Sequence, residues 1–315
     1  MSYFPGLAAD RTEPASLCRQ LVVLSGKGGT GKTSVVAALA SLAQSKVLAD
    51  CDVDAADLHL VLDPERKHTE RFISGKEARI DSERCSSCGM CMEYCRFDAI
   101  RMRSNNGGRA VYAVDPIACE GCGLCARVCT PGAVDMAAAE RGEWFVADTR
   151  HGPLVYARLN AGGENSGKLV TVVRDQALTL AKDMGASLVV VDGPPGIGCP
   201  AIASVTGADL ILAVTEPTVS GLHDLERVAA LVEGFGLPLA VCINKVDLNP
   251  DMALRITEVC AARGWPVVGQ LDYDVAVVRA QVAGTSIVEY GDSLVAQQIR
   301  QMWNVLNDML RKAEA

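Results

Sequence analysis

Short runs of consecutive apolar residues, separated by stretches with helical periodicity, organise most of this chain. The runs that we interpret as strands are Gln20–Leu24, Lys46–Asp50, Ser187–Asp192, Leu210–Val214, Pro238–Ile243 and Val267–Leu271. An apolar run without alternation is typical of a strand that is buried on both faces. Strands of this kind that alternate with helices predict an α/β fold, with a mostly parallel, doubly wound sheet covered by helices on both sides.

The pattern changes between about Arg79 and Glu143, where cysteines and short strand-like runs replace the long helical periods. This segment is an internal repeat, because each of its two cysteine-rich loops is followed by a short apolar run. The two runs are Phe97–Ile100 and Pro131–Val134. We therefore interpret residues 79–143 as a small inserted α+β domain within a discontinuous main domain of residues 20–78 and 144–315. Residues 1–19 show no periodic pattern and are interpreted as an N-terminal arm.

The last apolar pattern, Leu294–Leu310, has helical spacing. Its polar face mixes Gln, Arg, Asn and Asp instead of being basic, so we expect a helix packed on the sheet and not one lying on a membrane surface.

Composition narrows the class of protein. The chain has 315 residues, of which 49% are hydrophobic, and a formal net charge of −8, which is typical of a soluble globular protein and gives no basic field for nucleic acid. No apolar run approaches the roughly 18 residues of a membrane-spanning helix, so stable membrane insertion is not expected. Eight of the 13 cysteines have metal-cluster spacing and no signal segment opens the chain, which favours the reducing cytoplasm.

A glycine-rich loop lies directly after the first strand and directly before a helix that we expect from about Lys32 to Gln44. It matches the phosphate-binding pattern GxxxxGK[ST] and comprises Gly26, Lys27, Gly28, Gly29, Thr30, Gly31, Lys32 and Thr33. Backbone N–H groups of such a loop point at phosphate oxygens. We expect Lys32 to contact the β and γ phosphates and the Thr33 hydroxyl to ligate Mg²⁺.

Two sets of four cysteines have the spacing CxxCxxCxxxC. The first is Cys85, Cys88, Cys91 and Cys95, and the second is Cys119, Cys122, Cys125 and Cys129. Thiolates in this spacing hold [4Fe-4S] clusters, and in proteins with two such motifs the fourth cysteine ligates the other cluster. We therefore predict one cluster on Cys85, Cys88, Cys91 and Cys129, and another on Cys119, Cys122, Cys125 and Cys95. Zinc is the alternative metal, but two matched sets with this spacing favour iron–sulfur clusters.

The chain resembles the MinD/ParA/Mrp group of ATPases through the loop GKGGTGKT, the segment Asp50–Asp54 and the segment Val189–Pro195. The resemblance covers nearly everything outside residues 79–143, which look like an inserted two-cluster ferredoxin domain. It implies that Lys27 reaches the partner's nucleotide in an ATP-dependent homodimer. It also implies that Asp54 polarises the attacking water and that Asp192 holds Mg²⁺ through water.

Two further residues are candidates. Asn244 opens the segment Asn244-Lys245-Val246-Asp247, which looks like the part of the family fold that reads the adenine base, although a similar run also occurs in guanine-binding proteins. Cys199 follows Asp192 by seven residues, a spacing that the nitrogenase iron protein uses for a cluster shared between subunits. A shared cluster needs a second cysteine that the sequence does not supply, so a redox thiol and an ordinary loop thiol remain alternatives.

These observations lead to three functional hypotheses. The first is an ATP-hydrolysing redox switch, in which nucleotide-dependent dimerisation is coupled to electron transfer or to binding of a redox or cluster-accepting protein. The second is an iron–sulfur cluster carrier of Mrp type. The third is a MinD/ParA-like positioning ATPase with structural or sensing clusters.

Overall fold

The computed structural model describes residues 18–104, 110–163 and 166–312. The chain divides into two compact units. The large unit takes in the chain up to Thr69, Trp144–Arg158 and the chain from Ser166 onward, and the cysteine unit takes in Glu70–Glu143 and Leu159–Asn165. Most of the expected N-terminal arm lies outside the described residues, and Arg19 already begins the first strand.

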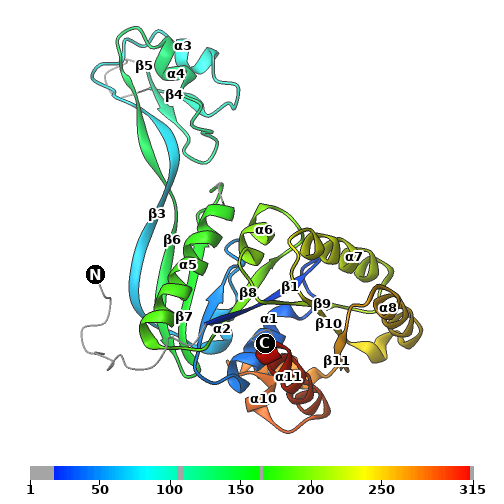
Figure 1. The fold of residues 1–315 in the computed structure, drawn as a ribbon. Helices are drawn as coiled ribbons and strands as arrows, with labels where there is room; N and C mark the ends of the chain where they lie inside the picture. Colours follow the sequence, from blue (N-terminus) through cyan, green and yellow to red (C-terminus); the bar gives the residue numbers. More distant parts are fainter. Residues whose placement is uncertain (1–17, 105–109, 164–165, 313–315) are drawn as a thin grey trace. The chain divides into compact units, whose positions relative to one another are not determined.

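The described strands form one nine-stranded sheet, in the order β11-β10-β9-β1-β8-β2-β7-β6-β3, and one two-stranded sheet of β4 and β5 (Figure 1). The strands of the large sheet, in chain order, are β1 (Arg19–Ser25), β2 (Lys46–Asp50), β3 (Glu65–Ile80), β6 (Val134–Thr149), β7 (Gly152–Leu159), β8 (Leu188–Pro195), β9 (Leu210–Thr215), β10 (Leu239–Asn244) and β11 (Val267–Leu271). Neighbouring strands from β11 to β7 pair in parallel. The predicted α/β fold with a mostly parallel sheet is confirmed.

Helices cover both faces of the parallel strands. Successive residues of each strand point to opposite faces of the sheet, and residues on both faces are buried. The helices of the large unit are α1 (Lys32–Leu42), α2 (Leu58–Leu62), α5 (Ser166–Met184), α6 (Cys199–Val205), α7 (Val219–Gly234), η1 (Val246–Leu248), α8 (Pro250–Arg263), α9 (Val275–Val282), α10 (Ile287–Tyr290) and α11 (Leu294–Lys312). One core joins α1, α2, α10 and α11 to a single face of the sheet. The apolar stripe of α11 is part of this core, as its periodicity predicts.

The cysteine unit has its own small core. It contains α3 (Met90–Glu93), β4 (Ile100–Ser104), β5 (Ala110–Val114) and α4 (Leu124–Val128), and β4 pairs with β5 in antiparallel orientation. Ile100, Tyr112 and Val134 pack there with the buried Cys85 and Cys91. So few apolar residues cannot form a large core, and cysteine side chains make up much of this small core.

Two long strands, β3 and β6, run from the large unit into the cysteine unit (Figure 1). The sequence did not predict β3, whose residues ERKHTERFISGKEARI are mostly charged and exposed. β3 is the last strand of the sheet, so pairing with β6 stabilises it more than burial does, and no apolar pattern arises. No helix of the described residues is long and apolar enough to cross a membrane.

Candidate functional sites

The phosphate-binding loop connects β1 to α1, as its sequence predicts. Gly31 precedes α1 with φ of 90°, a left-handed conformation, and its carbonyl accepts the first helical hydrogen bond, from Val35 N at 3.0 Å. A Cβ at Gly31 would lie 2.3 Å from Nδ2 of Asn244, so this position requires glycine both for its backbone angle and for its close neighbour.

Three carboxylates surround Lys32 at the carboxyl ends of adjacent strands. Asp50 ends β2 and pairs in register with Asp192 of β8, and both are buried. The Lys32 ammonium is hydrogen-bonded to Asp192 Oδ1, and Asp52 Oδ2 lies 3.8 Å from Lys32 Nζ. Burial alone would lower the pKa of Lys32, but the charges of Asp192 and then Asp50 and Asp52 raise it above its usual value. Lys32 therefore stays charged in the core.

The carboxyl groups around Lys32 have raised pKa values, and one of their oxygens has no partner among the described residues. Burial, and then the nearby charge of Asp192, raise the pKa of Asp50 well above its usual value, and burial raises that of Asp52 to about 6. Oδ2 of Asp192 and Oγ1 of Thr30 are buried and have no hydrogen-bond partner within the described part of the chain. Surplus buried carboxylate oxygen next to a phosphate-binding loop is the donor set that Mg²⁺ prefers, so these residues fit a Mg²⁺–nucleotide complex.

A cavity of about 230 Å³ lies beside the loop, between Gly31 on one side and Tyr273 and Val278 on the other. Asn244 contributes to its wall, and its Nδ2 donates to Thr30 O at 2.7 Å. The cavity has the mixed polar and apolar lining that a nucleotide base needs. The structure thus places the predicted Asn244 next to the phosphate-binding loop.

Two further lysines, Lys27 and Lys245, make polar contacts on the outer side of the phosphate-binding loop. Nζ of Lys27 lies 2.8 Å from Glu216 Oε1 and 3.0 Å from Ser220 Oγ. Nζ of Lys245 donates to Gly29 O at 3.0 Å and lies 3.2 Å from Glu216 Oε2. Glu216 therefore holds two lysines around the phosphate-binding loop, although no sequence pattern marks it.

The two predicted cysteine sets each surround a separate small cavity of the cysteine unit. One cavity is lined by Cys85, Cys88, Cys91 and Cys129, and the other by Cys119, Cys122, Cys125 and Cys95. In each set the fourth cysteine comes from the other CxxCxxCxxxC motif. The chain fold thus brings together the same interleaved groups of four that the spacing predicts.

The surroundings of these thiols suit cluster ligands. Backbone N–H groups donate to sulfur from Ala78 to Cys119 (3.5 Å), from Ser87 to Cys85 (3.4 Å) and from Ala133 to Cys129 (3.2 Å). Hydrogen bonds of this kind stabilise cluster thiolates. No three His, Cys, Asp or Glu side chains of the described chain converge on a single metal ion.

Comparison with known proteins identifies the large unit. Residues 21–287 match the model of the CobQ/CobB/MinD/ParA nucleotide-binding domain. The chain belongs to this family. The phosphate-binding loop and the three carboxylates near it therefore belong to a nucleotide-binding domain.

Individual proteins are also similar to this chain. An uncharacterized Methanocaldococcus jannaschii protein, MJ0578, is 36% identical over 236 residues, which cover 73% of this chain and 79% of the relative. The MinD septum site-determining protein of Pyrococcus horikoshii, solved with Mg-ADP, has a TM-score of 0.55 at 16% identity and covers 94% of this chain. MinD of Aquifex aeolicus has a TM-score of 0.53 at 20% identity and covers 92%. At such identities the structural matches show the fold alone.

The structure places a carboxylate other than the predicted Asp54, from the same segment, next to Lys32. Asp54 is exposed, whereas Asp52 is largely buried within 3.8 Å of Lys32 Nζ. Both belong to the segment DCDVD, so spacing could not choose between them. The prediction for Asp54 stays a prediction, but Asp52 is the carboxylate that the structure brings to the site.

For two other predicted residues, Thr33 and Cys199, the structure gives a position but no contact from which a role follows. Thr33 lies in the first turn of α1, directly after Lys32. Cys199 is exposed at the start of α6, with Gly167 of α5 beside it. Cys51, Cys242 and Cys260 are buried thiols of the core.

Proposed function

We propose that this chain is an ATP-hydrolysing protein that carries two [4Fe-4S] clusters, and that its nucleotide state controls electron transfer or the binding of a redox partner. The observation that carries the proposal is the pair of interleaved four-cysteine cavities in a chain that also has a complete phosphate-binding loop. Neither feature alone indicates coupling. Together, in one chain of a nucleotide-binding family, they indicate a nucleotide-dependent iron–sulfur protein.

The residues of the nucleotide site take the following roles. Backbone N–H groups of the loop and Lys32 bind the β and γ phosphates, so the Lys32 ammonium exchanges Asp192 for phosphate oxygen when ATP binds. Thr33 and Asp192 would hold Mg²⁺, which when bound neutralises charge on those phosphates. Asp52 is placed to orient the attacking water and to accept its proton, because it is the partly exposed carboxylate nearest Lys32.

The cysteine unit would supply one-electron chemistry. Cys85, Cys88, Cys91 and Cys129 would hold one cluster and Cys119, Cys122, Cys125 and Cys95 the other, and each cluster when bound accepts and releases one electron. Hydrogen bonding of the Met90 N–H group and the Ser86 hydroxyl lowers the pKa of Cys88, which favours the thiolate form that binds iron.

The proposal also includes a homodimer that forms when MgATP is bound, with Lys27 turning from Glu216 to the partner's nucleotide. The partner protein would be a redox protein or a cluster acceptor. The net charge of −8 gives no reason to expect nucleic acid among the partners.

The cluster part is tested on anaerobically purified protein by iron and sulfide content and by the visible spectrum. The unmodified chain should contain about eight irons, four for each cluster. Cys85→Ala with Cys129→Ala removes two ligands of the same cluster and should leave about half the iron. Cys85→Ala with Cys95→Ala affects both clusters and should remove nearly all of it. Equal iron in the two double variants would refute the interleaved assignment, and absence of sulfide from the unmodified protein would refute the clusters.

A positioning ATPase is the second candidate, because relatives of this chain include putative septum site-determining MinD proteins of green algae such as Chlorella vulgaris, 28% identical over 113 residues. The two proposals differ in their ligands. ATP-dependent sedimentation with lipid vesicles or DNA would favour positioning, and a cluster that responds to ATP without such binding would favour the redox proposal.

A further inference from the structure

The helix α2 is only five residues long and lies between the loop that carries Asp52 and the strand β3. We propose that α2 couples the nucleotide site to the strands that continue into the cysteine unit. The biological purpose of this coupling rests on the proposed function, but its existence is a separate property of the large unit and is tested separately.

The first end of α2 is bonded to the nucleotide site. The backbone N–H of Leu58 donates to Asp50 Oδ2 at 3.2 Å, and the N–H of Asp52 donates to Asp50 Oδ1 at 3.1 Å. Asp50 is fully buried, and its pairing partner Asp192 is hydrogen-bonded to Lys32. When phosphate replaces Asp192 as the partner of Lys32, the charge around Asp50 changes, and α2 is the element directly bonded to Asp50.

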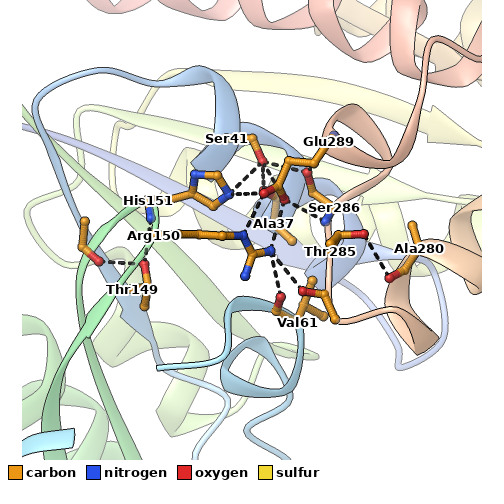
Figure 2. A network of polar contacts seen from close by, with 12 residues as sticks. Ala37, Ser41, Val61, Thr149, Arg150, His151, Ala280, Thr285, Ser286 and Glu289 are labelled. Atoms are coloured by element: carbon orange, nitrogen blue, oxygen red, sulfur yellow. Dashed lines mark hydrogen bonds and ion pairs between the residues drawn. The ribbon is translucent and has the colours of Figure 1, made fainter. Parts of the chain in front are cut away.

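The last turn of α2 is bonded to the turn between β6 and β7. Nη2 of Arg150 donates to Val61 O and to Gly284 O, each at 3.0 Å (Figure 2). The same guanidinium is paired with Glu289, from Nε to Oε1 at 2.7 Å and from Nη2 to Oε2 at 3.1 Å. Figure 2 shows the Arg150 guanidinium pointing toward Val61 and Glu289, and a charge-assisted pair with two parallel bonds holds its orientation.

The Glu289 carboxylate contacts two further residues besides Arg150, and these contacts restrict its position. It accepts from the backbone N–H of Ser286 at 2.8 Å, and His151 Nε2 lies 2.9 Å from its Oε1. Ser41 of α1 lies 2.6 Å from the Ser286 hydroxyl, so the helix that begins with Lys32 contributes as well (Figure 2). A displacement of α2 relative to α1 must therefore also move or break the contact of Arg150.

One face of α2 packs on the same strands. The ring of His59 stacks on Tyr156 of β7, with centroids 5.3 Å apart and an angle of 6° between the planes. The Tyr156 hydroxyl accepts from Arg66 Nε of β3 at 2.8 Å, and its ring lies 4.8 Å from that of Phe145 of β6. Through Tyr156, α2 thus contacts all three neighbouring strands β7, β6 and β3.

The covalent connection from α2 to β3 is short as well. Asp63 has a left-handed backbone, with φ of 46°, Pro64 has a fixed φ, and β3 begins at Glu65. Because β3 and β6 continue into the cysteine unit, a change in the position of α2 acts on the two strands between which the predicted cluster ligands lie in the sequence. Contacts alone do not establish coupling, so the test measures a response that depends on nucleotide.

The test is hydrogen exchange of the full-length protein with and without MgATP, measured on peptides from α2, residues 66–80 and residues 134–148. In the unmodified protein we expect MgATP to change exchange at least about fivefold in all three regions, the lower end of ordinary coupling. In His59→Ala and Arg150→Gln the response of α2 should remain, whereas the response of residues 66–80 and 134–148 should fall below about twofold. Tyr156→Phe removes one hydroxyl and should give an intermediate response.

The matched control is Arg255→Gln, an exposed arginine of α8, which should behave as the unmodified protein. Thermal melts and ATP titrations accompany each variant, and Tyr156→Phe keeps the test valid if Arg150→Gln does not fold. The inference is wrong if MgATP does not change the hydrogen exchange of residues 66–80 and 134–148 in the unmodified protein. It is also wrong if these residues respond fully to MgATP in His59→Ala and Arg150→Gln. Neither outcome depends on the clusters, whose presence is decided by iron and sulfide content.

Discussion

Three glycines of the phosphate-binding loop provide a graded test of its geometry. A Cβ at Gly28 meets no atom within 4 Å, and Gly28 is not in the left-handed region. Gly29 also has open space around it but has φ of 81°. Gly31 has φ of 90°, and its Cβ would lie 2.3 Å from Asn244 Nδ2. Alanine at Gly28 therefore adds no steric or backbone penalty. Alanine at Gly29 adds backbone strain alone, and alanine at Gly31 adds backbone strain and a steric clash.

The magnitudes follow from these differences. Gly28→Ala should change the free energy of unfolding by less than about 1 kcal/mol, with a small stabilisation possible through the unfolded state. Gly29→Ala should cost about 1–2 kcal/mol, the strain of an L-residue in the left-handed region. Gly31→Ala should cost about 1 kcal/mol more than Gly29→Ala, because Asn244 must move and its 2.7 Å hydrogen bond to Thr30 O is lost.

The assay is urea unfolding of the nucleotide-free protein in EDTA, with the slope of the transition compared among variants. The background Asn244→Ala supplies the control, because it removes the clashing side chain. In that background Gly31→Ala should cost about the same as Gly29→Ala, within about 0.5 kcal/mol. If Gly28→Ala were as damaging as Gly31→Ala, or if Asn244→Ala brought no relief, the loop geometry described above would be wrong.

Two other properties of the large unit can be checked in the same way. Asp52→Asn should lower the kcat of ATP hydrolysis by about 10²–10⁴-fold, while Asp54→Asn stays within a few-fold. The kcat/KM should rise with pH through about 6, where the half-buried Asp52 loses its proton. The reverse order of the two variants would assign the role to Asp54. Burial alone would raise the pKa of Glu289, but its hydrogen bonds to Arg150, Ser286 and His151 lower this pKa below its usual range. The contribution of Glu289 to stability is therefore present at neutral pH and is lost below about pH 4.3 as the pH falls. Urea midpoints should therefore fall more steeply between pH 5 and pH 3 in the unmodified protein than in Glu289→Gln, and equal slopes would contradict this.

The parts of the molecule that follow local rules were predictable from the sequence. The loop between β1 and α1 needs glycines and a lysine at fixed positions, so eight consecutive residues were enough to locate the phosphate site. The parallel strands are buried on both faces and therefore appear as uninterrupted apolar runs. The interleaved cluster assignment stays a prediction, although the cysteines that line each cavity of the cysteine unit are the grouping that it names.

The parts that were missed depend on contacts between distant residues. β3 is charged and exposed, and only its pairing with β6 identifies it as a strand. Arg150 and Glu289 are separated by 139 positions, and no local pattern marks either residue. The choice of Asp52 over Asp54 depends on how the seven-residue loop between β2 and α2 turns, and the repeated carboxylates of that loop give no local signal for it.

Coupling between ATP and the clusters is the central claim, and electron paramagnetic resonance of the dithionite-reduced, anaerobic protein tests it most directly. Spectra are recorded with and without MgATP, and Lys32→Ala serves as the control that cannot bind the phosphates. The account predicts signals of two reduced [4Fe-4S] clusters whose line shape or midpoint potential shifts with MgATP in the unmodified protein but not in Lys32→Ala. Cluster signals that are identical in all four samples would contradict it.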